Sequence, residues 1–336
     1  MYQILIKNLK KKMKYIDTAL IGCGYWGTNI ANTLLKIKKK IIICDINNHN
    51  SKLLKKRLRN KIFISNYKNI LENKKIKNLF FATPPSVNFK LVKRAITYKK
   101  NIFIEKPAFR KISEFKKIRK IKKNYKNIIM IGYVYCYNNY INFIKNFIKR
   151  SGISNILYLN FQRQNLGPVR NDVDVQYDLA THDLSILLYF FSKYPKLINK
   201  VEHKFLKKNI SDISNLSFKI NKTSIDINSS WLNPDKVRRI SVITKKKMLL
   251  YNELLPAKKI KIFNKYAHYP KIDKFKDSFF KKKAKIYEGN NFSPKINDNE
   301  PLLNEIKYFF TCVKKNRKPL TDLSFGQKIV EILERI

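Results

Sequence analysis

At residues 18–27 the chain reads TALIGCGYWG, an apolar run followed by three closely spaced glycines. The first four residues are typical of a short buried strand, and apolar residues recur at helical spacing after the last glycine. Gly22 permits a tight turn, Gly24 lets backbone approach a pyrophosphate, and Gly27 lets a helix pack closely on the strand. The stretch therefore predicts the start of a dinucleotide-binding fold, with a glycine turn that binds nothing as the alternative.

Strands and helices alternate over the first 130 or so residues, which predicts a parallel sheet with helices on both faces. Asp45 ends the second strand, 18 residues after Gly27, where a carboxylate can accept hydrogen bonds from ribose hydroxyls. No arginine follows it, so we expect NAD as the cofactor and not NADP. Strands are predicted at residues 18–21, 41–45, 61–65, 79–83, 101–105 and 128–132.

The pattern changes after Gly132. A helix is predicted at 139–150, a strand at 155–163 and a strongly apolar helix at 178–191, and β-rich runs follow at 201–206, 215–220, 224–231 and 239–244. These runs indicate a mostly antiparallel sheet. Residues 256–298 are not assigned, and helices at 301–315 and 325–335 end the chain. The predicted fold class is α/β: a Rossmann domain at 14–133 and an α+β domain with an open sheet at 134–336, after an N-terminal extension at 1–13.

The composition fits a folded chain with an unusual charge. Hydrophobic residues make up 44% of the 336 residues, which excludes a disordered protein. The formal net charge of +49 would ordinarily indicate nucleic-acid binding, but it comes from 60 Lys and only 12 Arg, spread along the whole chain. A nucleic-acid surface favours clustered basic residues and arginine. We therefore expect solvated lysines and an anionic small-molecule partner, and we do not expect specific nucleic-acid binding.

The cysteines and the apolar segments bear on location. The four cysteines show no metal-ligand or CxxC spacing, so we expect reduced thiols, no metal and a cytoplasmic protein. No apolar run reaches the roughly 18–20 residues of a membrane span. Either Met1 or Met13 serves as the start, because Met13 falls just before the first strand.

Two positions suggest chemistry beyond cofactor binding. Lys106 follows Glu105 at the end of a predicted strand, where an ammonium can polarise a hydroxyl or carbonyl that exchanges a hydride. Asp178 and His182 are spaced i, i+4 on a predicted helix, and a histidine is the usual acceptor of a hydroxyl proton. The alternative is that Asp178 only caps the helix start. Thr83 begins a Thr-Pro-Pro turn at the same sheet edge as Lys106, and taken alone this is a rigid turn.

The order and spacing of these motifs resemble those of the Gfo/Idh/MocA oxidoreductases. The motifs are Gly22-Cys23-Gly24-Tyr25-Trp26-Gly27, Ala82-Thr83-Pro84-Pro85, Glu105-Lys106-Pro107 and Asp178-Leu179-Ala180-Thr181-His182-Asp183. Further segments, such as Arg163-Gln164-Asn165-Leu166-Gly167 and Ser230-Trp231-Leu232-Asn233-Pro234, resemble the nucleotide-sugar branch of UDP-N-acetylglucosamine 3-dehydrogenase-like enzymes. Two positions depart from the family pattern: Asn88 replaces a usual histidine, and Asn139-Tyr140 replaces a usual Pro-Ala.

The resemblance implies an NAD-dependent enzyme that oxidises a ring hydroxyl, at C3, of a nucleotide-linked sugar in surface-polysaccharide synthesis. It implies Lys106, His182 and Asp178 as catalytic residues and a homodimer or homotetramer formed through the C-terminal sheet. The implied NAD site consists of Gly22, Gly24, Tyr25, Trp26, Gly27, Asp45, Thr83, Pro84, Glu105 and Lys106. Candidates for the sugar and its diphosphate are Tyr137, Arg163, Asn165 and Arg170, and Trp231 is expected to pack. Alternatives are an inositol or free-sugar dehydrogenase, and a non-catalytic basic protein that binds NAD or nucleic acid.

Overall fold

The computed structural model describes residues 16–58, 62–122, 125–268 and 284–336. These form two compact units. Unit 1 contains the chain up to Tyr137 and returns with Glu300–Glu331, and unit 2 contains Asn138–Asn299 and Ile332–Ile336. The predicted extension at residues 1–13 lies outside the described residues.

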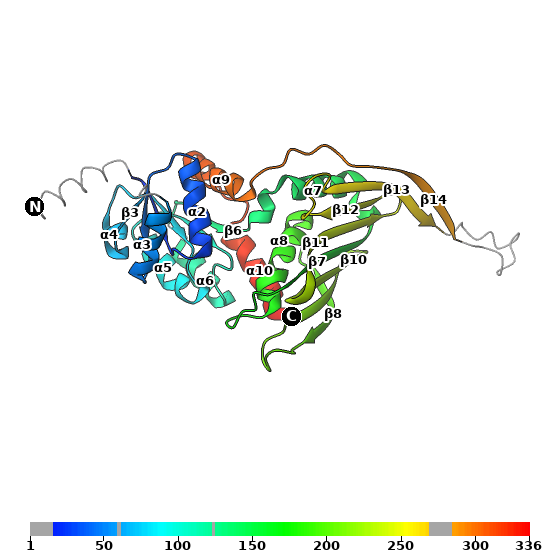
Figure 1. The fold of residues 1–336 in the computed structure, drawn as a ribbon, viewed down its shortest axis with the longest axis horizontal. Coiled ribbons are helices and arrows are strands. Elements are labelled where there is room, and N and C mark those ends of the chain that lie inside the picture. Colours follow the sequence, from blue (N-terminus) through cyan, green and yellow to red (C-terminus); the bar gives the residue numbers. More distant parts are fainter. Residues whose placement is uncertain (1–15, 59–61, 123–124, 269–283) are drawn as a thin grey trace, which may run out of the picture. The chain divides into compact units, whose positions relative to one another are not determined.

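Unit 1 is built on a six-stranded parallel sheet (Figure 1). Its strand order is β3-β2-β1-β4-β5-β6, the order of a dinucleotide-binding fold, which confirms the predicted Rossmann domain. The strands are β1 (Thr18–Ile21), β2 (Ile41–Cys44), β3 (Phe63–Ile64), β4 (Asn78–Phe81), β5 (Asn101–Glu105) and β6 (Ile129–Gly132). The helices that follow them are α2 (Tyr25–Lys36), α3 (Asn48–Arg57), α4 (Tyr67–Glu72), α5 (Pro85–Thr97) and α6 (Ile112–Lys122).

The C-terminal helices α9 (Pro301–Lys315) and α10 (Leu323–Arg335) lie largely in unit 1, which differs from the predicted division at residue 133. Phe309 of α9 is fully buried against the sheet, with its ring centroid 5.1 Å from that of Phe80 and 6.0 Å from that of Phe103. Burial of an aromatic side chain of this size contributes roughly 1.5–3 kcal/mol. The apolar face of α9 is therefore buried against the Rossmann sheet, although 168 residues separate α9 from the end of β6.

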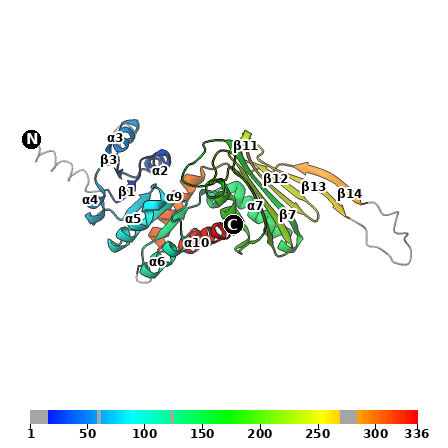
Figure 2. The ribbon, with the colours of Figure 1, turned by 90° about the horizontal axis from the view of Figure 1, so that it is seen from below.

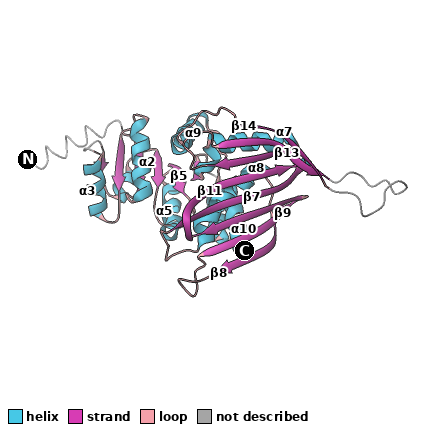
Figure 3. Cartoon of the chain, turned by 45° about the vertical axis from the view of Figure 1, so that its right-hand side comes forward, coloured by secondary structure: helices cyan, strands magenta, loops and turns pink. Residues whose placement is uncertain are grey.

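Unit 2 is built on an eight-stranded sheet of order β14-β13-β12-β11-β7-β10-β9-β8 (Figure 3). All neighbouring strands are antiparallel except β7 and β10, which confirms the predicted mostly antiparallel sheet. Its strands are β7 (Ile156–Leu166), β8 (Lys196–His203), β9 (Ile213–Ile220), β10 (Thr223–Ser230), β11 (Leu232–Thr244), β12 (Met248–Asn252), β13 (Ile260–His268) and β14 (Lys285–Phe292). The unassigned segment 256–298 thus supplies two strands, β13 and β14.

Helices α7 (Asn139–Ser151) and α8 (Thr181–Phe191) lie along one face of this sheet (Figure 2). Alternate residues of β7, among them Leu159 and Phe161, are fully buried, whereas Tyr158 and Asn160 between them are partly exposed. This period-2 pattern is why one face of the sheet receives the helices. Among the helices of the described ranges, none has both the length and the apolar character to cross a bilayer.

Candidate active site

The glycine loop between β1 and α2 requires glycine at two of its three positions. Gly22 has φ +97°, and a Cβ there would lie 2.7 Å from the carbonyl carbon of Ala82. A Cβ on Gly27 would lie 2.9 Å from the carbonyl carbon of Gly22 and closer still to its oxygen. Gly24 has no atom within 4 Å of the position of a Cβ. The loop is therefore packed at both ends and open in the middle, at Gly24.

The start of α2 is suited to an anion. Gly24 is the N-cap and has no side chain to bond the first backbone N–H groups of the helix. Free N–H groups at a helix N-terminus, together with the helix dipole, attract phosphate. Tyr25 and Trp26 follow with exposed fractions of 79% and 40%, and their rings meet edge to face at 5.9 Å. The open N-terminus of α2, flanked by two exposed aromatic rings, is suited to the pyrophosphate of NAD.

Asp45, immediately after β2, connects the glycine loop to the start of α3. Its Oδ2 accepts a hydrogen bond from the Cys23 backbone N–H at 2.7 Å, and its Oδ1 accepts one from Asn47 N–H at 2.9 Å. A carboxylate has about four acceptor positions, so it can also accept from ribose hydroxyls. Ile46 beside it is fully exposed, a feature that the sequence analysis did not single out.

Asn88, which replaces the usual family histidine, links two loops of the site. It is fully buried on α5; its Oδ1 accepts a hydrogen bond from the Thr83 hydroxyl, and its Nδ2 donates to the Ala108 carbonyl at 3.0 Å. The Thr-Pro-Pro turn after β4 is thereby tied to the segment that follows Glu105 and Lys106. Asn88 therefore supplies a structural contact at this edge of the sheet.

Glu105 is the last residue of β5 and is half-buried, and Lys106 follows it directly. Burial raises the pKa of Glu105 to about 7, and Lys106 opposes this shift. A second carboxyl, Glu305 of α9, is fully buried; burial and the negative charge of Glu105 hold its pKa well above its usual range. Neither Glu305 oxygen has a hydrogen-bond partner among the described residues. Two carboxyl groups and one ammonium therefore share this end of the sheet.

The expected role of Tyr137 differs from its place in the structure. It was a candidate for binding the sugar, but it is 8% exposed, and its hydroxyl lies 2.9 Å from Thr321 Oγ1 within unit 1. Its ring packs on Tyr308 at 5.2 Å. Tyr137 is a core residue, because the short 3-10 turn at Val134–Tyr137 packs against α9.

In unit 2, Asp178 lies in a π-helical turn, Gln176–Ala180, that precedes α8. Such turns are rare and occur frequently at functional sites. The helix-cap alternative for Asp178 is wrong: Asp174 accepts the hydrogen bond from Tyr177 N–H at 2.9 Å. Asp178 Oδ2 instead accepts from Trp231 Nε1 at 3.1 Å. Trp231 is fully buried, so it packs as expected and also orients this carboxylate.

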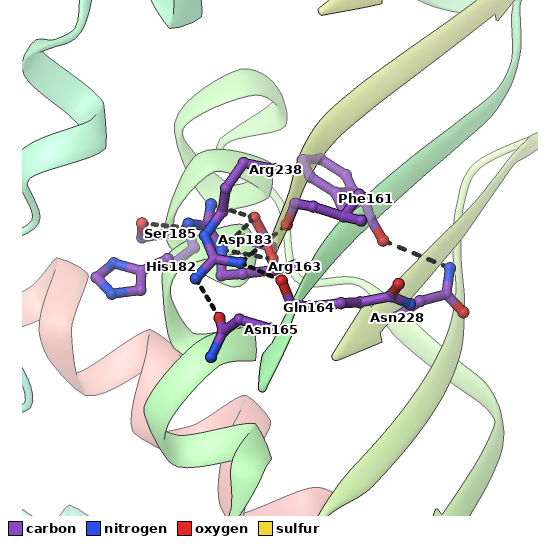
Figure 4. A network of polar contacts seen from close by, with 10 residues as sticks. Phe161, Arg163, Gln164, Asn165, His182, Asp183, Ser185, Asn228 and Arg238 are labelled. Carbon is purple, nitrogen blue, oxygen red and sulfur yellow. Dashed lines mark hydrogen bonds and ion pairs between the residues drawn. The ribbon is translucent and has the colours of Figure 1, made fainter. Parts of the chain in front are cut away.

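His182 lies in the first turn of α8 and is partly exposed. The next residue, Asp183, is buried and forms a bidentate ion pair with Arg163 of β7. In Figure 4 the His182 ring lies at the edge of this network and points away from Arg163. The prediction that Arg163 binds a diphosphate is therefore corrected, because the side chain is only 6% exposed and is occupied by Asp183.

The two remaining substrate candidates lie near Asp178 and β7. Arg170 is 36% exposed, bonds Asp172 at 2.7 Å and lies 3.6 Å from Asp178 Oδ1. Asn165 accepts a hydrogen bond from Arg238 Nη2 at 2.5 Å, and Arg238 Nη1 also donates to the Gln164 carbonyl at 2.9 Å. The sequence analysis quoted Asp183 within a motif but gave it no role, and it did not single out Arg238, for which the scarcity of arginine was a signal.

Comparison with known proteins agrees with the geometry of unit 1. Residues 16–133 match the family model GFO_IDH_MocA, described as oxidoreductase family, NAD-binding Rossmann fold. The N-terminal domain is that of a Gfo/Idh/MocA oxidoreductase. The predicted cofactor, NAD, agrees with this match. No curated protein matches the chain.

Several solved structures share the fold along most of the chain. UDP-N-acetylglucosamine 3-dehydrogenase from Acidithiobacillus ferrooxidans has 18% identity and a TM-score of 0.75, over 94% of this chain and 95% of that one. A 3-ketoreductase from Actinomadura kijaniata, solved with TDP-benzene and NADP, has 11% identity and a TM-score of 0.75, over 96% of both chains. GenD2 from gentamicin A biosynthesis, solved with NAD, has 13% identity and a TM-score of 0.74, over 95% and 92%.

Proposed function

We propose that this oxidoreductase uses NAD to oxidise a ring hydroxyl, at C3, of a nucleotide-linked sugar such as a UDP-N-acetylhexosamine, in surface-polysaccharide synthesis. The observation that carries the proposal is the placement of Lys106 at the same sheet edge as the open glycine loop. The carboxyl edge of a parallel sheet is where such folds bind their ligands. The named activity of the Acidithiobacillus structure supports the choice of substrate class.

In this proposal the cofactor lies along the glycine loop. The N–H groups of the first α2 turn hold its pyrophosphate, Asp45 accepts from its ribose, and Tyr25 and Trp26 cover its open side. Thr83, Pro84 and Glu105 line the remainder of the site. NAD, when bound, supplies the acceptor for a hydride.

The residues of the chain handle the proton and the developing charge. His182 takes the proton of the sugar hydroxyl as a general base. Lys106 stabilises the negative charge that develops on the same oxygen, a preorganised electrostatic effect. Asp178 completes the catalytic set, and its carboxylate contacts Trp231 and Arg170.

The diphosphate of the substrate requires a cation. Arg170 is the candidate that remains, because it is partly exposed and lies beside Asp178. An arginine fork can make two charge-assisted hydrogen bonds to a diphosphate. Asn165 is a second candidate for a polar contact with the sugar. We further propose a cytoplasmic location. We also propose self-association through the eight-stranded sheet, and light scattering of the purified protein measures the oligomeric state.

The experiment is a screen of NADH formation with UDP-sugars, free inositol and free glucose. We expect turnover of a UDP-sugar and weak or no turnover of the free sugars. Lys106→Ala and His182→Asn should each lower kcat by roughly 10²-fold or more, with NAD affinity little changed. Efficient oxidation of inositol with no activity on UDP-sugars would overturn the substrate assignment. Salt-sensitive DNA binding with no turnover at all would favour the non-catalytic alternative.

A further inference from the structure

The ion pair between Arg163 and Asp183 is the most enclosed pair of charges seen within the described parts of the chain. Arg163 Nε lies 3.0 Å from Asp183 Oδ2, and Arg163 Nη2 lies 2.8 Å from Oδ1. The two side chains are 6% and 2% exposed. The pair joins the centre of β7 to the first turn of α8 (Figure 4).

Stability alone is a weak reason for such a pair. Two charges lose their hydration when they are buried, and the loss can exceed their mutual attraction. A well-packed apolar pair of similar size is often as stable or more stable. The surrounding positions of β7, Leu159 and Phe161, are apolar and fully buried, so an apolar pair would suit this layer.

Asp183 of this pair lies in the same turn of α8 as His182. Asp183 directly follows His182, and Ser185 Oγ donates to the His182 carbonyl at 2.6 Å, so this turn of α8 is held from two sides. The bidentate contact holds the Asp183 side chain and, with it, the backbone of the first turn of α8, which carries His182. The other charged or titratable groups described around this turn in unit 2 are Arg170, Asp172, Asp174, Tyr177, Asp178, Lys200, Glu202, Arg238 and Glu334.

We propose that Arg163 and Asp183 are positioning residues for His182. They hold its ring in place and, as a neutral pair, let it keep the proton affinity that a general base needs. The inference rests on the proposed role of His182 but is tested partly without turnover. It replaces the expected contact between Arg163 and a diphosphate.

The first test is a titration of the imidazoles by NMR, with histidine labelled at Cε1. The chain has only four histidines, and His182→Asn assigns the signal. Asp183→Asn leaves Arg163 as an uncompensated positive charge, which disfavours the protonated imidazole. We expect its proton affinity to fall about three- to tenfold. The double variant Arg163→Met with Asp183→Asn removes both charges and should restore the value to within about twofold.

The matched control is Asp298→Asn, which breaks an exposed ion pair with Lys259 in the same unit, at 2.9 Å. It should leave the His182 titration unchanged. The inference is overturned if Asp183→Asn is folded and His182 titrates as in the unaltered protein. If Asp183→Asn does not fold, the double variant decides: it must fold and retain the His182 titration, and failure to do so overturns the inference.

The second test separates positioning from substrate binding. Arg163→Lys keeps the charge and loses the two-pronged contact, so kcat should fall about tenfold or more while KM for the UDP-sugar changes less than twofold. If KM rises tenfold with kcat unchanged, Arg163 binds substrate and the inference is wrong. An enzyme that turns over no sugar contradicts the proposed function alone, because the NMR titration still measures the effect of the pair on His182.

Discussion

The carboxyl groups of Glu105 and Glu305 predict that the stability of unit 1 decreases as the pH rises above about 4.5. The pKa of Glu105 is about 7 in the folded protein, against an ordinary value of 4.5. Between these pH values the folded protein binds more protons at Glu105 than the unfolded chain does. The contribution of Glu105 to stability is therefore fully present below about pH 4.5 and is lost as the pH rises through 7. The difference corresponds to about 3 kcal/mol at most. Glu305, whose pKa is also raised, acts in the same direction.

The perturbation is Glu105→Gln, which removes the titrating group and the charge that acts on Glu305. Between pH 5 and 8 the unfolding free energy of the variant should decline less than that of the unaltered protein, by up to about 3 kcal/mol. Urea unfolding of the apo protein measures it. The chain has two tryptophans, so in a Trp231→Phe background the fluorescence of Trp26 reports unit 1 alone.

The control for this prediction is Glu300→Gln, which removes an exposed carboxylate paired with Lys36 at 2.8 Å in the same unit. Exposed pairs contribute little, so its pH dependence should match that of the unaltered protein within a few tenths of a kcal/mol. Equal pH slopes for Glu105→Gln and the unaltered protein, or stability that rises from pH 5 to 8, would refute the reasoning.

Three further predictions concern the site. Gly27→Ala forces the backbone to move, so urea unfolding should show a loss of stability of roughly 1–3 kcal/mol. Gly24→Ala should leave stability within about 0.5 kcal/mol and should weaken NAD binding measured by calorimetry. Equal losses of stability in the two variants would contradict the packing described for the loop. Asp45→Ala should reduce the preference for NAD over NADP in the same assay, and equal affinities in the unaltered protein would contradict the assignment. Trp231→Phe removes the hydrogen bond to Asp178 and should lower kcat about tenfold with NAD affinity unchanged; normal turnover would show that the bond serves packing only.

Local features of unit 1 were predictable from the sequence. A buried strand, a glycine turn and an amphipathic helix are each encoded within about ten neighbouring residues, because steric limits at glycine and the helical period act over that range. β5 was predicted with its observed bounds, Asn101–Glu105, and the carboxylate at Asp45 was placed at the end of β2. The edge of the sheet at which Lys106 lies follows directly from these short-range signals.

Tertiary structure alone decided which long-range partners the polar residues found. Arg163 and Asp183 are 20 residues apart, and Asp178 and Trp231 are 53 apart, so no local period could pair them. α9 was predicted as a helix with its observed bounds, but its membership of unit 1 depends on which sheet could bury Phe309. The period of a sequence determines which face of an element is apolar, whereas the partner that covers that face is selected by shape and burial across the whole fold.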